Sequence, residues 1–102
     1  VRGYPDIRSI ILDQSPESAF EKALVAAKSM GWAVAEISRE NGAIDATATT
    51  FWFGFKDDIA IRITTSAGGG SVVDVRSVSR VGGSDIGANA NRIRAFTEKM
   101  KN

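Results

Sequence analysis

The sequence has 102 residues, 43% of them hydrophobic and 25% charged, which is typical of one soluble domain, residues 1–102, with a single hydrophobic core. This composition excludes a wholly disordered chain, a collagen-like repeat and a membrane bundle. The formal net charge of +1 gives no indication of a nucleic-acid partner, and the absence of cysteine and histidine excludes disulfides, thiolate or imidazole catalysis and nearly all zinc, copper or haem sites.

The chain begins at Val1 rather than at a methionine, so we expect a processed or truncated product. It contains neither an apolar run of about eighteen residues, the length that a membrane span requires, nor a signal peptide. Any membrane anchor or export signal is therefore expected before Val1.

The first elements in chain order are a strand, Ile7–Leu12, and a helix, Pro16–Met30. Ser15 can cap the start of the helix by accepting a hydrogen bond from a free amide group, and proline suits the first helical position. Gly31 is the residue type expected just past a helix end. The apolar stripe of this helix consists of Phe20, Leu24, Ala27 and Met30.

Three more strands are predicted next, at Trp32–Ile37, Ala43–Thr50 and Asp58–Thr65. The turn Glu40-Asn41-Gly42 joins the first two, because Asn-Gly tolerates the positive φ angles of a tight hairpin. The second and third strands alternate apolar and polar residues, as strands with one buried face do.

The last hairpin has a register that residue types alone predict. Folding the chain symmetrically about Gly68 places apolar residues opposite apolar ones and sets two opposite charges against each other. Strict alternation fails near Ser77, because Val75 and Val78 are three residues apart, so we expect a bulge there. The predicted pairs are Ile61 with Val75, Ile63 with Val73, and Arg62 with Asp74.

A second helix follows the strand break at Val81-Gly82-Gly83, with Ser84 as its expected cap. The order strand, helix, four strands, helix favours the α+β class over a parallel sheet. We expect a curved antiparallel sheet with the helices packed on one face, a helix-grip or TBP-like fold. The buried stripe of the second helix is expected to consist of Ile86, Asn89 or Ala90, Ile93, Phe96 and Met100.

The helical stripes and the strand alternation together predict the core. We expect the space beneath the last helix to be mostly filled, because the bulky side chains of that helix can occupy the room that Ala46 and Ala48 leave. The predicted core includes Phe20, Leu24, Ile59, Ile61, Ile63, Val73, Val75, Ile93 and Phe96.

Several segments, spread over essentially the whole chain, are distinctive as a set: Tyr4-Pro5-Asp6-Ile7, Ala43-Ile44-Asp45-Ala46-Thr47, Trp52-Phe53-Gly54-Phe55-Lys56-Asp57-Asp58, Ile61-Arg62-Ile63, Val73–Gly82, Ser84–Asn89 and Arg92–Phe96. As a set they resemble the bacterial domain of unknown function family 1499. The resemblance implies a bacterial source and, because members often carry this domain after hydrophobic segments or an export signal, a location in the cell envelope or periplasm. It implies no activity, and Gly83 departs from the family pattern only in the loop before the last helix.

Three aromatic residues, Trp52, Phe53 and Phe55, lie within four positions at a strand junction. They could form the mouth of a ligand pocket, an anchor for a partner protein or a contact with a membrane surface. The alternative is that they fold inward and close one end of the core, since large aromatic side chains dominate small cores.

A charged face is predicted on the last two strands, where Arg62, Asp74 and Arg76 point the same way and Asp58 is diagonal to Arg76. Two arginines could bind a carboxylate or a phosphate. The alternative is a solvated ladder of cross-strand pairs, which contributes little to stability.

Asn89 and Arg92 lie three residues apart on one face of the last helix. They could recognise a ligand in a groove, or satisfy backbone groups within the fold. Asp57 and Asp58 are adjacent in sequence, so in a strand their carboxylates point to opposite faces and no metal site is expected.

Two kinds of function remain open. The first is a non-catalytic interaction domain of the bacterial cell envelope, which meets a partner protein or a membrane surface with the aromatic segment and the charged sheet face. The alternative is a module that binds a small apolar ligand in a groove between the sheet and the C-terminal helix. We expect no enzyme and no cofactor, because the chain lacks histidine and cysteine and no serine has a recognisable base beside it.

Overall fold

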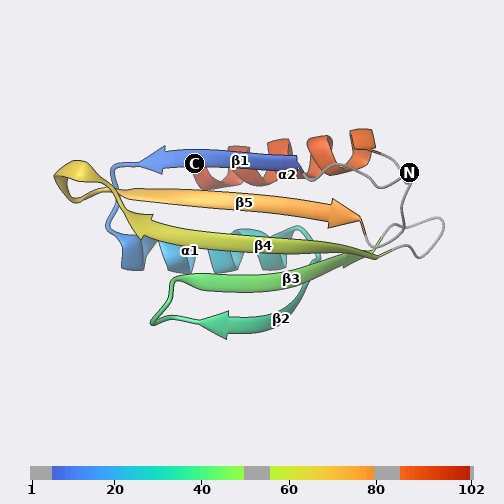
Figure 1. Cartoon of the computed structure of the whole chain (residues 1–102), viewed down its shortest axis with the longest axis horizontal. Helices are drawn as coiled ribbons and strands as arrows, with labels where there is room; N and C mark the ends of the chain where they lie inside the picture. The colour runs from blue at the N-terminus through green and yellow to red at the C-terminus, as the bar shows by residue number, and fades with distance from the viewer. Residues whose placement is uncertain (1–5, 50–55, 80–85, 102) are drawn as a thin grey trace.

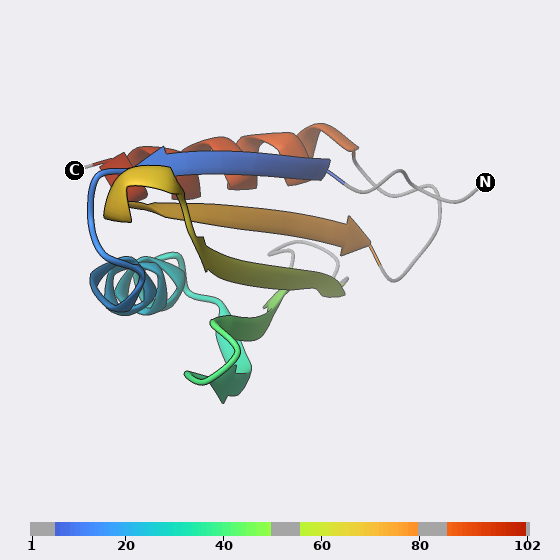
Figure 2. The same ribbon diagram turned by 60° about the vertical axis from the view of Figure 1, so that its left-hand side comes forward.

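The computed structural model describes residues 6–49, 56–79 and 86–101. Its sheet is fully antiparallel, with the strand order β1-β5-β4-β3-β2. Both helices lie on the same side of this twisted sheet (Figures 1 and 2). The elements are β1 (Asp6–Leu12), α1 (Pro16–Ser29), β2 (Ala33–Ser38), β3 (Ala43–Thr49), β4 (Lys56–Thr65), a short 3₁₀ turn η1 (Ala67–Gly69), β5 (Ser71–Ser79) and α2 (Ile86–Lys101).

Helix α1 begins where its sequence predicts and ends close to the predicted residue. The Ser15 side chain accepts a hydrogen bond from the backbone amide of Ser18 at 3.2 Å, and Pro16 occupies the first turn. Met30 caps the C-terminus and Gly31 follows with a φ of 82°, a left-handed conformation that glycine adopts without strain. The helix therefore ends one residue earlier than predicted.

The predicted register of the last hairpin is confirmed, since Arg62 pairs with Asp74 and the two apolar pairs beside them are also formed. The predicted bulge at Ser77 is wrong. Pairing of β5 with both neighbours runs through Ser77 without a shift, and the irregularity lies in β2 between Val34 and Glu36. Alternation continues through Ser77 because this small polar side chain is buried on the helix side, where Arg92 bonds to it, while Val78 belongs to the other face.

The core lies between the sheet and the two helices. Every residue predicted for it is buried. The rings of Trp32 and Phe96 stack with their centroids 5.3 Å apart, and Phe96 and Met100 are fully enclosed. This enclosure agrees with a filled space beneath α2. Two surface hollows of about 460 and 340 Å³ are lined by described residues outside that helix. Neither of the two described helices is long and apolar enough to cross a membrane.

Replacing Ile61 with alanine is expected to lower the free energy of unfolding by about 2–5 kcal/mol, because Ile61 is fully buried and its loss leaves a cavity. The matched control is Ile11→Ala on β1, where the side chain is 77% exposed and the cost should stay below about 1 kcal/mol. Chemical denaturation measures both values. Equal midpoints for the Ile61 variant and the parent protein would contradict the core assignment.

Candidate functional site

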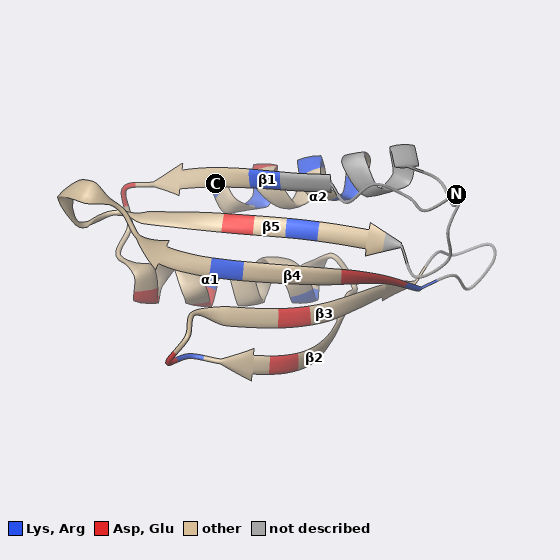
Figure 3. Cartoon of the chain, in the orientation of Figure 1, with Lys and Arg blue, Asp and Glu red and all other residues tan. Residues whose placement is uncertain are grey.

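The face of the sheet opposite the helices is covered by no described element, and we call it the open face. Acidic positions lie on β2 and β3, and both acidic and basic positions lie on β4 and β5 (Figure 3). Strand register places its side chains in rows that run across the sheet, because residues paired on neighbouring strands point to the same side. The residues of the open face used below are Glu36, Asp45, Thr47, Asp58, Ala60, Arg62, Asp74 and Arg76.

Arg62 and Asp74 are register partners, yet each bonds to a different strand. Arg62 Nη1 donates to Asp45 Oδ1 on β3 at 3.0 Å, and Asp74 accepts a hydrogen bond from Ser9 on β1. Asp45 lies diagonal to Arg62, two positions along β3 from its direct partner Ala43, within reach of a long side chain. The two contacts thus join β3 to β4 and β1 to β5, and Arg62 and Asp74 do not bond to each other.

Arg76 is an exposed residue of the open face and pairs with Ala60 on β4. In register order Asp45, Ala60 and Arg76 follow one another on β3, β4 and β5, so a carboxylate and a guanidinium are separated by two strand spacings, about 10 Å, with only a methyl group between them. A shallow groove of about 340 Å³ lies there, bordered also by Asp58. Among the described residues Arg76 has no hydrogen-bond or ion-pair partner.

Arg92 does not lie on an accessible surface. Its Nη1 is 2.7 Å from Asp57 Oδ2 and 3.4 Å from Ser77 Oγ, and the side chains of Arg92 and Asp57 are only 11% and 5% exposed. The group ties α2 to β4 and β5 beneath the sheet. We therefore assign Arg92 a structural role, and its partner Asp57 was missed by the sequence analysis. The signal was present: Asp57, Ser77 and Arg92 are three polar residues at positions where strand and helix periodicity require inward side chains.

The remaining sequence candidates are placed as follows. Trp52, Phe53 and Phe55 lie outside the described residues, as does the side chain of Asn89, whose backbone belongs to α2. Asp57 is buried and Asp58 exposed, so the two carboxylates point apart as predicted. Within residues 6–49, 56–79 and 86–101, no three acidic side chains are grouped as metal ligands.

The buried ion pair generates a stability prediction. Asp57→Ala should lower the free energy of unfolding by about 3–5 kcal/mol, because it leaves the Arg92 charge buried without its carboxylate. The exposed pair provides the control, since Asp45→Ala should cost less than about 1 kcal/mol. In the double variant Asp57→Ala/Arg92→Met part of the loss should be recovered. Strictly additive losses, measured by urea denaturation, would argue against a coupled pair.

Comparison with known proteins agrees with this architecture. The crystal structure of Ara h 8.0201 is similar at a TM-score of 0.72 and 9% sequence identity, over 96% of this chain and 94% of that chain. At this identity the likeness shows the fold alone, a helix-grip arrangement. No curated protein matches the sequence. The family described as "Protein of unknown function (DUF1499)" matches residues 2–100, nearly the whole chain, and the protein therefore belongs to the DUF1499 family.

Proposed function

We propose that this protein is a non-catalytic interaction domain that binds a partner protein with the open face of its sheet. The observation that carries the proposal is the position of Arg76, which has no partner among the described residues and lies beside a groove whose opposite wall holds Asp45. An unpaired guanidinium is a strong hydrogen-bond donor for a partner carboxylate, and arginine is enriched among residues that dominate binding energy.

The closed core favours surface recognition over enclosure of a ligand. A small apolar molecule beneath α2 would need the space that Trp32, Phe96 and Met100 fill. The alternative function, an apolar-ligand module with its groove between sheet and C-terminal helix, therefore has less support than docking on the open face. Opening a pocket there would cost the packing of residues that are almost completely buried.

Support for a non-catalytic role comes from the chemistry of the polar side chains. Among the described residues, the hydroxyls of Ser9 and Ser77 bond to charged side chains. Ser9 donates to the carboxylate of Asp74, which is far too weak a base to deprotonate a hydroxyl, and Ser77 lies beside the guanidinium of Arg92. A guanidinium has no free lone pair to accept a proton, so it cannot activate a serine hydroxyl as a general base. The sequence supplies no histidine or cysteine for that purpose.

The partner that fits best is a protein whose surface carries both signs of charge. The open face presents carboxylates from Glu36 and Asp45 towards one edge and Arg76 towards the other, so a matching surface places a basic group over the first and an acidic group over the second. The family resemblance supports a partner in the bacterial cell envelope. The aromatic segment with Trp52, Phe53 and Phe55 connects β3 to β4 in sequence and is a further candidate contact in this proposal.

The test is site-specific photocrosslinking in living bacteria, with the crosslinking residue at Thr47 on the rim of the groove or, for comparison, at Val25 on the exposed side of α1. We expect one discrete protein adduct from position 47 and none from position 25. Arg76→Glu should lower the adduct yield about tenfold, since a hydrogen bond to a charged group contributes roughly 1.5–3 kcal/mol.

The matched control is Arg94→Glu, which makes the same change of charge on an exposed position of α2. It should leave the adduct yield unchanged. Equal losses in both variants, or the same adduct from both crosslinking positions, would contradict docking on the open face. Crosslinks to lipid alone would instead favour a membrane-surface contact.

A further inference from the structure

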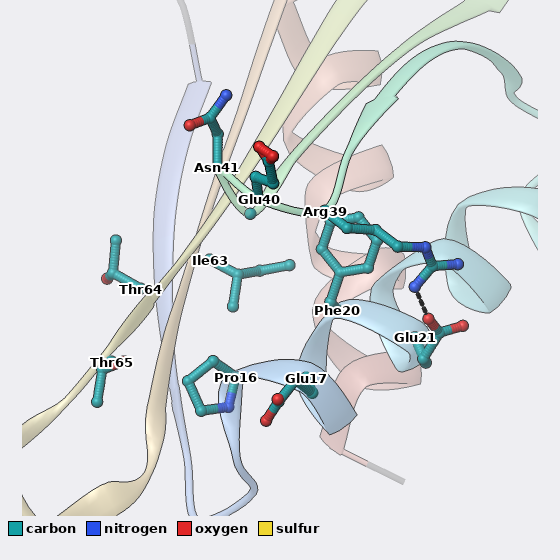
Figure 4. A pocket seen from close by; sticks show the side chains of 11 residues that line it. Pro16, Glu17, Phe20, Glu21, Arg39, Glu40, Asn41, Ile63, Thr64 and Thr65 are labelled. Carbon is teal, nitrogen blue, oxygen red and sulfur yellow. Dashed lines mark hydrogen bonds and ion pairs between the residues drawn. The ribbon is translucent and has the colours of Figure 1, made fainter.

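A second surface hollow, independent of the open face, lies on the helix side of the sheet. It has a volume of about 460 Å³ and is enclosed by the first turns of α1, the turn that connects β2 to β3, and the end of β4 (Figure 4). We call it the α1 groove. Phe20 and Ile63, both almost fully buried, provide apolar surface in its wall.

The walls of the α1 groove are held together by specific contacts. The backbone amide of Ile63 donates to the carbonyl of Gly42 at 2.8 Å, and a side chain at position 42 would collide with the Ile63 carbonyl oxygen. Arg39 bridges the other side of the groove, because its guanidinium forms an ion pair with Glu21 on α1 (Figure 4). The turn is thus fixed to both the strand and the helix.

The charge of the α1 groove is negative. Three glutamates and one arginine line it, and Arg39 neutralises only Glu21. Glu17 and Glu40 have no ion-pair partner among the described residues. The dipole of α1 favours the charge of Glu17 in the first helical turn, but no such effect accounts for Glu40 in the turn.

The chain itself shows how this wall accommodates a cation. The Arg39 guanidinium carbon lies 5.1 Å from the centre of the Phe20 ring while the same group bonds to the Glu21 carboxylate. An aromatic face combined with a carboxylate is an arrangement that stabilises organic cations through cation–π attraction and an ion pair. Arg39 already covers the face of the Phe20 ring, so a second cation would meet the apolar wall with Ile63 and the two carboxylates that Arg39 leaves unpartnered.

We propose that the α1 groove binds a small organic cation, an ammonium group carried on an apolar body. The apolar body lies against the wall that Phe20 and Ile63 form, and the ammonium group is attracted by Glu17 and Glu40, the lining carboxylates that Arg39 does not neutralise. An organic anion of the same shape is excluded, since it would bring a negative charge to two carboxylates. This site shares no residue with the groove on the open face, so either site can fail its test without affecting the other.

The experiment compares two probes of the same shape and opposite charge, phenylbutylamine and phenylbutyrate, by titration into the isotope-labelled protein with detection of backbone amide shifts. We expect saturable shifts that map to the first turns of α1, to residues 39–42 and to the end of β4 with the amine. Phenylbutyrate should bind at least about tenfold more weakly.

The variant Glu17→Gln/Glu40→Gln removes both carboxylates with little change in size, and it should weaken amine binding about tenfold. Its control, Asp13→Asn/Glu98→Gln, makes the same change of net charge at exposed positions outside both grooves and should bind as the parent protein does. The proposal is overturned by equal binding of the two probes, by equal loss in the two variants, by shifts that map elsewhere, or by no binding of the amine.

Discussion

The pairing of β4 with β5 is the constraint on which the other features depend. These two long strands are joined by η1 and lie inside the sheet, so their register decides which side chains face the helices. A slip of one residue would move Ile61 to solvent and Arg62 into the core, because alternate residues of a strand point to opposite faces. The helix-covered core and the charged open face are therefore two consequences of one register.

The core that this register creates is not wholly apolar. The Asp57–Arg92 pair and Ser77 lie within it, although burial of two charges costs desolvation energy that their attraction only partly offsets. What the pair contributes is a fixed position for α2 on the sheet. It joins α2 to β4 and β5 at a defined point, whereas apolar packing alone tolerates small shifts of a helix along a sheet. The aromatic segment precedes β4 in sequence, so Asp57 also anchors the strand into which that segment leads.

The two candidate binding surfaces would recognise their ligands through different interactions. On the open face, opposite charges are set apart by the small side chain of Ala60, an arrangement that selects partners by charge pattern and contributes to specificity more than to affinity. The α1 groove combines enclosed apolar surface from Phe20 with an excess of negative charge, which suits a compact ligand. Because the two surfaces lie on opposite sides of the sheet, a bound ligand would not compete with a bound partner for space.

The sequence by itself determined the order of elements, the cap at Ser15, the register about Gly68 and the composition of the core. These features depend on periodicity and on contacts between residues close in the chain, where residue type leaves few alternatives. The same periodicity led to the wrong prediction of a bulge at Ser77, because a buried polar residue and a bulge interrupt an apolar pattern in the same way.

Only the tertiary structure decided which residues meet across the fold. Arg62 bonds to Asp45 because β3 lies beside β4, and no local symmetry of the connecting segment predicts that register. Arg92 turns inward because α2 crosses the strands that carry Asp57. The α1 groove exists because the turn at 39–42 folds over a helix about twenty residues earlier in the chain. Such contacts depend on the twist of the sheet and the docking of its helices, which are collective properties of the packed chain.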